Sequence, residues 1–293
     1  MKIVKAQIES EQQATLGEGP VWDAATGKLY WIDIKSKKVY RYDPVTKSNE
    51  SWQLAQMVGC IVVVTDEKIR CALQDQIVEL NTTTGEQNFI TALEAELPDN
   101  RSNDGKADAA GRFWVGTLHM PGENGKAALY RIEKNLSVSK AVAPLGMSNG
   151  LGWSPDNKTM YLVDTPAKHV LKFDFSLTDG LLTNKEVVLD LQNAAGSPDG
   201  MCVDIEGNLW IAFYGGKRVA CYNPATGKQL AEVTVPAVNV TCCTFGGKDL
   251  DTMFITTARD GLSEDDLQTY PDSGSLFTAY PGVKGLPANR VII

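Results

Sequence analysis

Histidine is scarce in this chain of 293 residues, which contains only His119 and His169. The two do not lie within the short spacing of a histidine-based zinc site, so a site of that kind is nearly excluded. One stretch, GMSNG at 146–150, matches GxSxG, but the chain offers it no convincing histidine partner, and no glycine-rich phosphate-binding loop occurs. These features argue against covalent serine catalysis and against phosphate binding of that type.

Long apolar runs and clusters of positive charge are also missing. No stretch of 18 apolar residues occurs, so we expect no transmembrane helix. The formal net charge of −8 and the lack of a Lys/Arg run argue against nucleic acids and anionic membranes as partners. Because no apolar leader follows Met1, we expect a cytoplasmic protein. We also expect a monomer or a dimer.

The cysteines show none of the spacings that indicate a metal site or a redox pair. No two of the six form a CxxC motif, and the adjacent Cys242 and Cys243 cannot easily bridge each other. We therefore expect free, buried thiols in a reducing compartment. The other four are Cys60, Cys71, Cys202 and Cys221.

What the sequence does contain is one short phrase that recurs about every 45 residues. The phrase begins with an oxygen-bearing side chain and ends five residues later on a turn-forming polar residue. An apolar, aromatic stretch follows it each time. The clearest copies are EGPVWD at 18–23, NDGKAD at 103–108, NGLGWS at 149–154 and DGMCVD at 199–204.

The same period runs through the whole chain and predicts a β-propeller. Each aromatic stretch is followed by a second alternating segment, a turn rich in Asn, Asp, Pro and Gly, and further alternating residues. This pattern indicates about four strands per repeat and no long helix. We predict an all-β, six-bladed propeller with four antiparallel strands per blade, as a single domain over residues 1–293. An elongated β-solenoid is the alternative. The strand centres are Tyr30, Cys71, Trp114, Tyr161, Trp210 and Phe254.

The last repeat lacks an outer strand before the chain ends. The alternating segment at residues 3–9 could supply that strand and close the ring.

In a propeller, the first residues of the repeated phrase face one another around the central channel. Two carboxylates and two amides among them form a set of hard oxygen donors, which Ca²⁺, Mg²⁺ and Mn²⁺ prefer. Nearby glycines allow close backbone approach. A purely structural turn would not need Glu18 at this position. The predicted ring consists of Glu18, Ile61 (or Cys60), Asn103, Asn149, Asp199 and Thr241.

Two residues near the ring have more than one interpretation. Arg101 could hydrogen-bond a polyhydroxylated or anionic substrate, or it could pair with Asp99 or Asp104. His119 lies in a long irregular segment at 116–124, which could cap the pocket and touch a substrate or serve only as a loop.

Several of these segments together resemble one known family over nearly the whole chain. The segments are LGEGPVW at 16–22, NRSNDGKAD at 100–108, SNGL at 148–151, PDGMC at 198–202, and FGG at 245–247 with GVKG at 282–285. The sequence is similar to the SMP-30/gluconolactonase/regucalcin-like proteins, six-bladed propellers that include sugar lactonases.

The resemblance implies specific roles for the ring residues. Glu18, Asn149 and Asp199 would bind one divalent cation (Ca²⁺, Mg²⁺, Mn²⁺ or Zn²⁺), and Asp199 would also be the proposed base. Arg101 and Asn103 would contact the sugar lactone, which makes Asn103 a substrate contact and not a ligand.

One departure from the family pattern concerns the substrate pocket. Some members carry an acidic pair soon after the Gly-Thr that matches residues 116–117, whereas this chain has Leu118, His119 and Met120 there. Glu123 follows a few residues later. His119 and Glu123 are therefore the candidate substrate contacts in this region, and the identity of the lactone is open.

The hypothesis is a metal-dependent lactonase acting on sugar-derived aldonolactones. The cation would polarise the lactone carbonyl, and Asp199 would take a proton from the attacking water. One alternative is a non-enzymatic calcium-binding or regulatory protein of the regucalcin type. Another is an interaction scaffold, which would not explain Glu18 and Asp199 in the channel ring.

Overall fold

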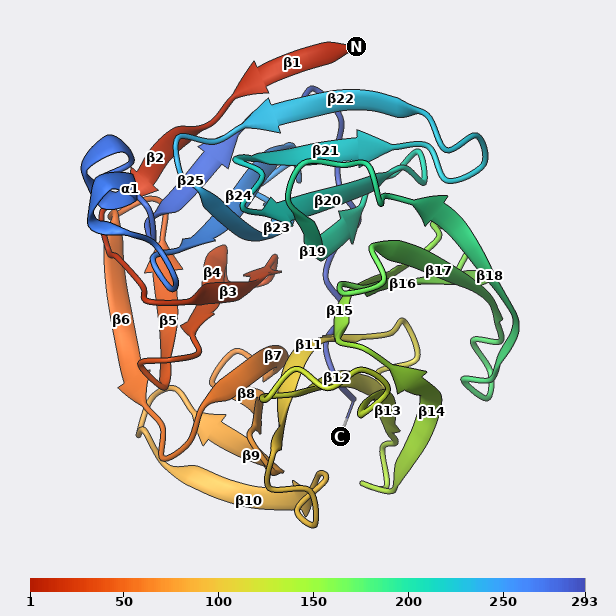
Figure 1. The fold of residues 1–293 in the computed structure, drawn as a ribbon. Helices are drawn as coiled ribbons and strands as arrows, with labels where there is room; N and C mark the ends of the chain where they lie inside the picture. Colours follow the sequence, from red (N-terminus) through yellow and green to blue (C-terminus); the bar gives the residue numbers. More distant parts are fainter. Residues whose placement is uncertain (293) are drawn as a thin grey trace.

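The computed structural model describes residues 1–292. The chain forms six β-sheets arranged around a central axis (Figure 1). The predicted six-bladed all-β propeller is confirmed. The one helix of this described part, α1 (Glu264–Thr269), has six residues. No helix within residues 1–292 is long and apolar enough to cross a membrane.

The first half of the chain forms three blades, each with its strands in sequence order from the axis outward. The first blade consists of β3 (Gly17–Asp23), β4 (Lys28–Asp33), β5 (Lys38–Asp43) and β6 (Ser48–Gln53). The second consists of β7 (Val58–Thr65), β8 (Lys68–Leu73), β9 (Gln76–Asn81) and β10 (Gln87–Ala92). The third consists of β11 (Asn100–Ala107), β12 (Phe113–His119), β13 (Ala127–Ile132) and β14 (Val138–Leu145).

The second half forms the remaining three blades in the same way. The fourth consists of β15 (Ser148–Trp153), β16 (Thr159–Asp164), β17 (His169–Phe175) and β18 (Leu182–Asp190). The fifth contains β19 (Ser197–Val203), β20 (Leu209–Tyr214), β21 (Arg218–Tyr222) and β22 (Gln229–Thr234). The sixth contains β23 (Asn239–Gly246), β24 (Thr252–Ala258) and β25 (Leu276–Ala279).

The N-terminal segment adds one strand to each of the last two blades. The strand β2 (Gln7–Ser10) pairs antiparallel with β25 and gives the sixth blade its fourth strand. The preceding strand, β1 (Lys2–Lys5), instead pairs in parallel with β22 and adds a fifth strand to the fifth blade. The prediction that residues 3–9 complete the last blade is therefore correct only for their second half. The chain changes blade at the buried Ala6, whose backbone N–H donates to the Thr234 carbonyl at 2.9 Å.

The innermost strands of the blades contact one another around the axis, while the outermost strands face solvent. All residues of β3 and β15 are buried, whereas most residues of β6 are exposed. Between the blades, apolar side chains from adjoining sheets pack together. Most polar side chains on the inner strands are therefore held away from bulk water, so they need hydrogen-bonding or charged partners within the protein.

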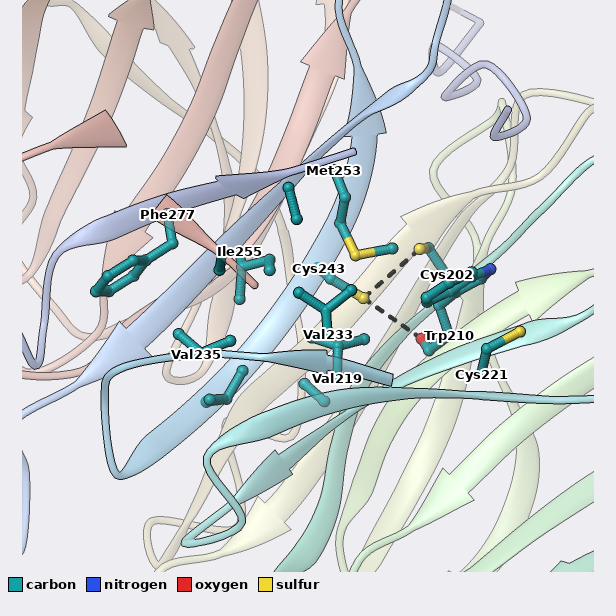
Figure 2. Packing of buried hydrophobic residues seen from close by; sticks show 14 of the residues in the cluster. Cys202, Trp210, Val219, Cys221, Val233, Val235, Cys243, Met253, Ile255 and Phe277 are labelled. Atoms are coloured by element: carbon teal, nitrogen blue, oxygen red, sulfur yellow. Dashed lines mark hydrogen bonds between the residues drawn. The ribbon is translucent and has the colours of Figure 1, made fainter. Parts of the chain in front are cut away.

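Figure 2 shows this packing between the fifth and sixth blades, where Trp210 and Cys202 meet Cys243 and Met253. The Sγ atoms of Cys202 and Cys243 lie 3.6 Å apart, which is too far for a disulfide bond. All six cysteines are buried and free, as the sequence predicts.

The residue that ends the repeated phrase links the inner strand to the next strand of its blade. In the third blade, the buried Asp108 accepts hydrogen bonds from Trp114 Nε1 at 2.8 Å and from Arg112 Nε at 2.7 Å. Its other carboxylate oxygen accepts backbone N–H groups of the following turn. In the fifth blade, Asp204 bonds Trp210 Nε1 at 2.9 Å in the same way. In both blades the aspartate thus links the turn to the tryptophan, and in the third blade it also pairs with the arginine.

We expect Asp108→Ala to destabilise the protein by about 3–5 kcal/mol, because it leaves the buried Arg112 charge without its carboxylate and the Trp114 N–H without an acceptor. The measurement is the free energy of unfolding from urea titrations followed by circular dichroism. Asp156→Ala, which removes a solvent-exposed aspartate from a turn of the fourth blade, serves as the control and should have a much smaller effect. An equal loss of unfolding free energy in the two variants would contradict this role of Asp108.

Candidate functional site

Each inner strand departs from regular pairing at the same level, where the repeated phrase begins. An irregularity of this kind turns side chains away from the alternating pattern of the strand. It therefore directs the first residues of the phrase toward the channel. The pairing shifts fall between Glu18 and Val21, Val58 and Cys60, Ser102 and Gly105, Ser148 and Leu151, Pro198 and Met201, and Val240 and Cys242.

The glycines of the phrase bring the inner strands into close contact. A Cβ atom on Gly150 would lie 2.6 Å from the Asp199 carbonyl oxygen, and one on Gly200 would lie 2.2 Å from Cys242 Sγ. Gly19 has a different role, because its φ of +51° is a conformation that favours glycine. Larger residues at Gly150 and Gly200 would push the strands apart and spread the ring.

Asn149 and Asp199, the predicted ligands from the fourth and fifth blades, are in direct contact. Both side chains are buried, and Asn149 Nδ2 donates to Asp199 Oδ1 at 2.5 Å and to Thr165 Oγ1 at 3.1 Å. Thr165 in turn donates to the Pro198 carbonyl at 2.9 Å. Because the amide nitrogen is engaged in this way, the side-chain oxygen of Asn149 is left for another partner.

The predicted substrate contacts of the third blade also lie beside the ring. Arg101 donates through Nη1 to the Ser102 carbonyl at 2.8 Å and to Asn103 Oδ1 at 3.2 Å. Asn103 donates to the Ser148 carbonyl of the next blade at 3.0 Å. Over residues 1–292, Arg101 forms no ion pair with Asp99 or Asp104, the two alternatives considered from the sequence. Its guanidinium is held in place by a backbone carbonyl and an amide.

Glu18 is buried in the first blade and faces other carboxylates. Its pKa is raised well above 4.5, first because burial disfavours the charged form and then because of the charges of Asp199 and Asp104. The Gly19 N–H, which donates to Glu18 Oε2 at 2.9 Å, and the Arg101 charge oppose this rise. The carboxylate therefore lacks sufficient positive charge nearby.

Asp199 has the same kind of environment. Burial raises its pKa from 3.8 to about 8, although the hydrogen bond from Asn149 and the Arg101 charge favour the ionised form. The Asp104 charge adds to the upward shift. A buried carboxyl that titrates near neutral pH is typical of a functional site.

Two channel residues, Asp104 and Lys106, were not singled out as site residues from the sequence. Asp104 is buried, its pKa is raised by burial, and its Oδ2 atom has no hydrogen-bond partner within the described chain. Lys106 donates from Nζ to the Met201 carbonyl on β19. A signal for Lys106 was present, because the other clear copies of the phrase have Val21, Gly152 and Cys202 at that position.

The remaining ring positions, Thr241 and Ile61, add no uncommitted oxygen ligand for a cation. The Thr241 hydroxyl donates to the Gly17 carbonyl at 2.6 Å, and Ile61 is a buried apolar side chain. The carboxylate and amide side chains of the ring therefore lie on the first, third, fourth and fifth blades.

His119 and Glu123 contact each other and not the ring. His119 Nδ1 accepts the backbone N–H of Glu123 at 3.1 Å, and the exposed Glu123 carboxylate lies 3.5 Å from Lys126 Nζ. In the part of the chain that the structure describes, neither side chain hydrogen-bonds to Glu18, Asn149 or Asp199. His119 is the last residue of β12, where it pairs with Asn100 of β11, and Glu123 lies in the loop that follows.

The chemistry of these residues fits a divalent cation. Glu18, Asn149 and Asp199 offer two carboxylates and an amide oxygen, all on buried inner strands. Residues 1–292 contain no group of three or more His, Cys, Asp and Glu side chains placed to hold a metal ion, so the amide is needed to complete this set. The upward pKa shifts of both carboxyls indicate a deficit of positive charge that a cation would relieve.

The fold and the site together define a six-bladed propeller with a buried carboxylate–amide centre on its axis. Residues 16–259 match the SMP-30/Gluconolactonase/LRE-like region. The chain therefore belongs to this family, as the resemblance predicts.

Individual relatives cover nearly the whole chain. Regucalcin of Danio rerio is 37% identical over 296 residues, with 98% of each chain covered. A Bacillus subtilis protein, YvrE, whose name gives it provisionally as a sugar lactone lactonase, is 35% identical over 274 residues, with 94% of each covered. Among solved structures, a calcium-binding protein, regucalcin, from Agrobacterium tumefaciens has a TM-score of 0.95 at 30% identity, covering 100% of this chain and 99% of its own.

We predict that the metal-stripped protein becomes less stable as the pH rises. The pKa of Asp199 is about 8 when folded and near 3.8 when exposed, so the folded state retains a proton that the unfolded state releases. This contribution to stability is complete below the lower pKa and is lost as the pH rises through the higher one. The measurement is the urea midpoint of metal-stripped protein across that range.

Asp199→Asn, which cannot ionise at this position, should show a smaller decrease over the same range. Added Ca²⁺ should raise the wild-type midpoint most at high pH, where the carboxylates are ionised. A midpoint that increases with pH, or identical profiles for the two proteins, would show that the buried carboxyls do not control stability.

Proposed function

We propose that this protein is a divalent-metal-dependent lactonase that hydrolyses sugar-derived aldonolactones. The observation that carries the proposal is the buried group of Glu18, Asn149 and Asp199, with Arg101 and Asn103 beside it. The first three are suited to hold a cation, and the other two present hydrogen-bonding groups next to it. The lactonase names within the family support this combination.

A divalent cation held by Glu18, Asn149 and Asp199 would supply positive charge that polarises the lactone carbonyl. In the proposed reaction, water attacks the carbonyl carbon while Asp199 accepts a proton from that water. The ring C–O bond then breaks, and the ring oxygen takes up a proton to become a hydroxyl group. The product is an open-chain aldonic acid, which ionises and releases one proton to solvent.

Arg101 and Asn103 are assigned to substrate orientation. The Arg101 guanidinium is fixed by the Ser102 carbonyl and Asn103 Oδ1 and has further N–H groups for ring hydroxyls. Burial lowers the pKa of Arg101 to about 10, so the side chain is charged at neutral pH. His119, at the end of β12, and Glu123, in the loop that follows, are proposed as outer contacts.

A second candidate is a cation-binding protein without hydrolytic activity. The Agrobacterium structure is described as a calcium-binding regucalcin, and the carboxylate–amide group would serve that role equally well. This alternative assigns no task to Arg101 and Asn103 beyond shaping the channel.

The test is hydrolysis of a panel of aldonolactones by metal-stripped protein, with Ca²⁺, Mg²⁺, Mn²⁺ or Zn²⁺ added back. Proton release is followed with a pH indicator and corrected for spontaneous ring opening. We expect turnover of at least one lactone that depends on the added metal. Metal binding with no turnover across the panel would favour the cation-binding alternative.

Asp199→Asn should reduce kcat by roughly 10²-fold or more, because it removes the proposed base and one charged ligand. Asp190→Asn, the same chemical change at an exposed position of β18, is the matched control and should retain wild-type kcat. Calorimetric titration with Ca²⁺ shows whether the metal is still bound. Wild-type turnover by Asp199→Asn would rule out the base role.

Arg101→Met should raise the KM for the lactone by about tenfold, while metal binding is retained. The guanidinium forms no hydrogen bond with Asn149 or with the Glu18 carboxylate, so its removal takes away none of the three proposed ligands. Steady-state kinetics and Ca²⁺ calorimetry on the same preparation separate the two effects. Loss of metal binding with unchanged KM would place Arg101 in the cation site instead.

A further inference from the structure

A second cavity lies on the propeller axis, beyond the carboxylates. It has a volume of about 300 Å³, and every blade contributes to its lining. The lining residues of the inner strands follow the site residues along the same strands: Val21 follows Glu18, and Val203 follows Asp199. At about 3.3 Å per residue, a separation of three to four positions places this cavity roughly 10 Å further along the channel.

The C-terminal segment forms one wall of this cavity. In Figure 1 it is the blue trace that crosses the middle of the ring, and residues 286–289 line the cavity. The segment is fastened on both sides, since the Gly285 N–H donates to the Leu250 carbonyl at 2.8 Å and the Val291 N–H donates to the Val63 carbonyl at 2.9 Å. Arg290 also pairs with Asp23 at 2.7 Å. The cavity therefore has a fixed wall at this end of the channel.

Most of the lining is apolar. It includes Val21, Val62, Trp153, Phe245 and Leu286. Such a surface favours the hydrocarbon part of a ligand, and the volume lies at the lower end of the range for small-molecule sites, roughly 300–1,000 Å³.

Lys106 places one positive charge at the inner end of this apolar cavity. Its side chain extends from β11 in the third blade to the Met201 carbonyl on β19 in the fifth, so it spans the channel between the two regions. No carboxylate of residues 1–292 lies within 4 Å of its nitrogen. Burial acts to lower the pKa of Lys106, but the charge of Asp104 and the neighbouring cysteines together outweigh it, so the pKa is raised and the group is an ammonium at neutral pH.

The ammonium has hydrogen-bonding capacity that the protein does not use. It carries three N–H donors, and the Met201 carbonyl is the one acceptor that the described residues provide. The half-buried side chain borders the cavity, so a ligand there could approach it.

We infer that this cavity binds a small aliphatic monocarboxylate, with its carboxylate on Lys106 and its chain against the apolar wall. A single ammonium matches one negative charge, and the adjacent Asp104 carboxylate disfavours a dianion such as phosphate. No arginine lines the cavity, so it lacks the paired donors that suit phosphate groups. This site is separate from the proposed lactonase site and does not depend on it.

The experiment titrates sodium hexanoate into the full-length, metal-stripped protein by isothermal titration calorimetry. Removing metal prevents the carboxylate from binding to a cation at Glu18 and Asp199. Lys106→Met should weaken binding at least about tenfold, because a hydrogen bond to a charged group is lost. Lys134→Met, which removes an exposed lysine from the same blade, is the matched control and should bind as the wild type does.

A second variant covers the case in which Lys106→Met does not fold, since that change also leaves Asp104 without a nearby cation. Ala288 is exposed and lines the cavity, so Ala288→Trp should obstruct it without disturbing the core. Two results together support the inference. Ala288→Trp binds hexanoate more weakly than the wild type does, and the wild type binds the uncharged 1-hexanol more weakly than it binds hexanoate. The inference is overturned if the wild type does not bind hexanoate, or if every folded variant of the two, Lys106→Met and Ala288→Trp, binds hexanoate as tightly as the wild type.

Discussion

The structure depends on the burial of like charges at one point on the propeller axis. Closing six sheets into a ring brings the inner strands together, and Glu18, Asp104 and Asp199 are buried among them. Burial and mutual repulsion both oppose ionisation, which explains the raised pKa of Glu18 and Asp199. Either protons or a bound cation would balance a centre of this kind, so the proposed metal binding would be coupled to stability and to pH.

The cations of the protein itself offset only part of this charge. Arg101 lies on the ring side of the channel, and Lys106 lies deeper, between the ring and the second cavity. Three carboxylates against these two cations leave one negative charge when all are ionised. A bound dication would reverse the sign to one positive charge, which suits a centre that stabilises developing negative charge on an oxygen.

The two names that recur among the relatives, regucalcin and lactonase, need not describe different sites. Cation binding requires only the carboxylate–amide group, whereas hydrolysis also requires the lactone to be oriented beside it. The groups available for that second task are Arg101 and Asn103, which lie on β11 and are linked to each other at 3.2 Å. The segment with His119 and Glu123 stands apart from them and is the part of the site most free to differ between substrates.

The sequence by itself determined the number of blades and the inner strands, and it predicted the members of the candidate ring. These depend on local patterns, namely period-2 alternation, turn residues and a phrase repeated at a constant interval, which each stretch of chain carries independently. Only the tertiary structure decided that residues 3–9 divide between two blades, that Asn149 bonds Asp199, and that Lys106 spans the channel. Those features arise from burial and from contacts between residues distant in sequence, and a local pattern contains no information about either.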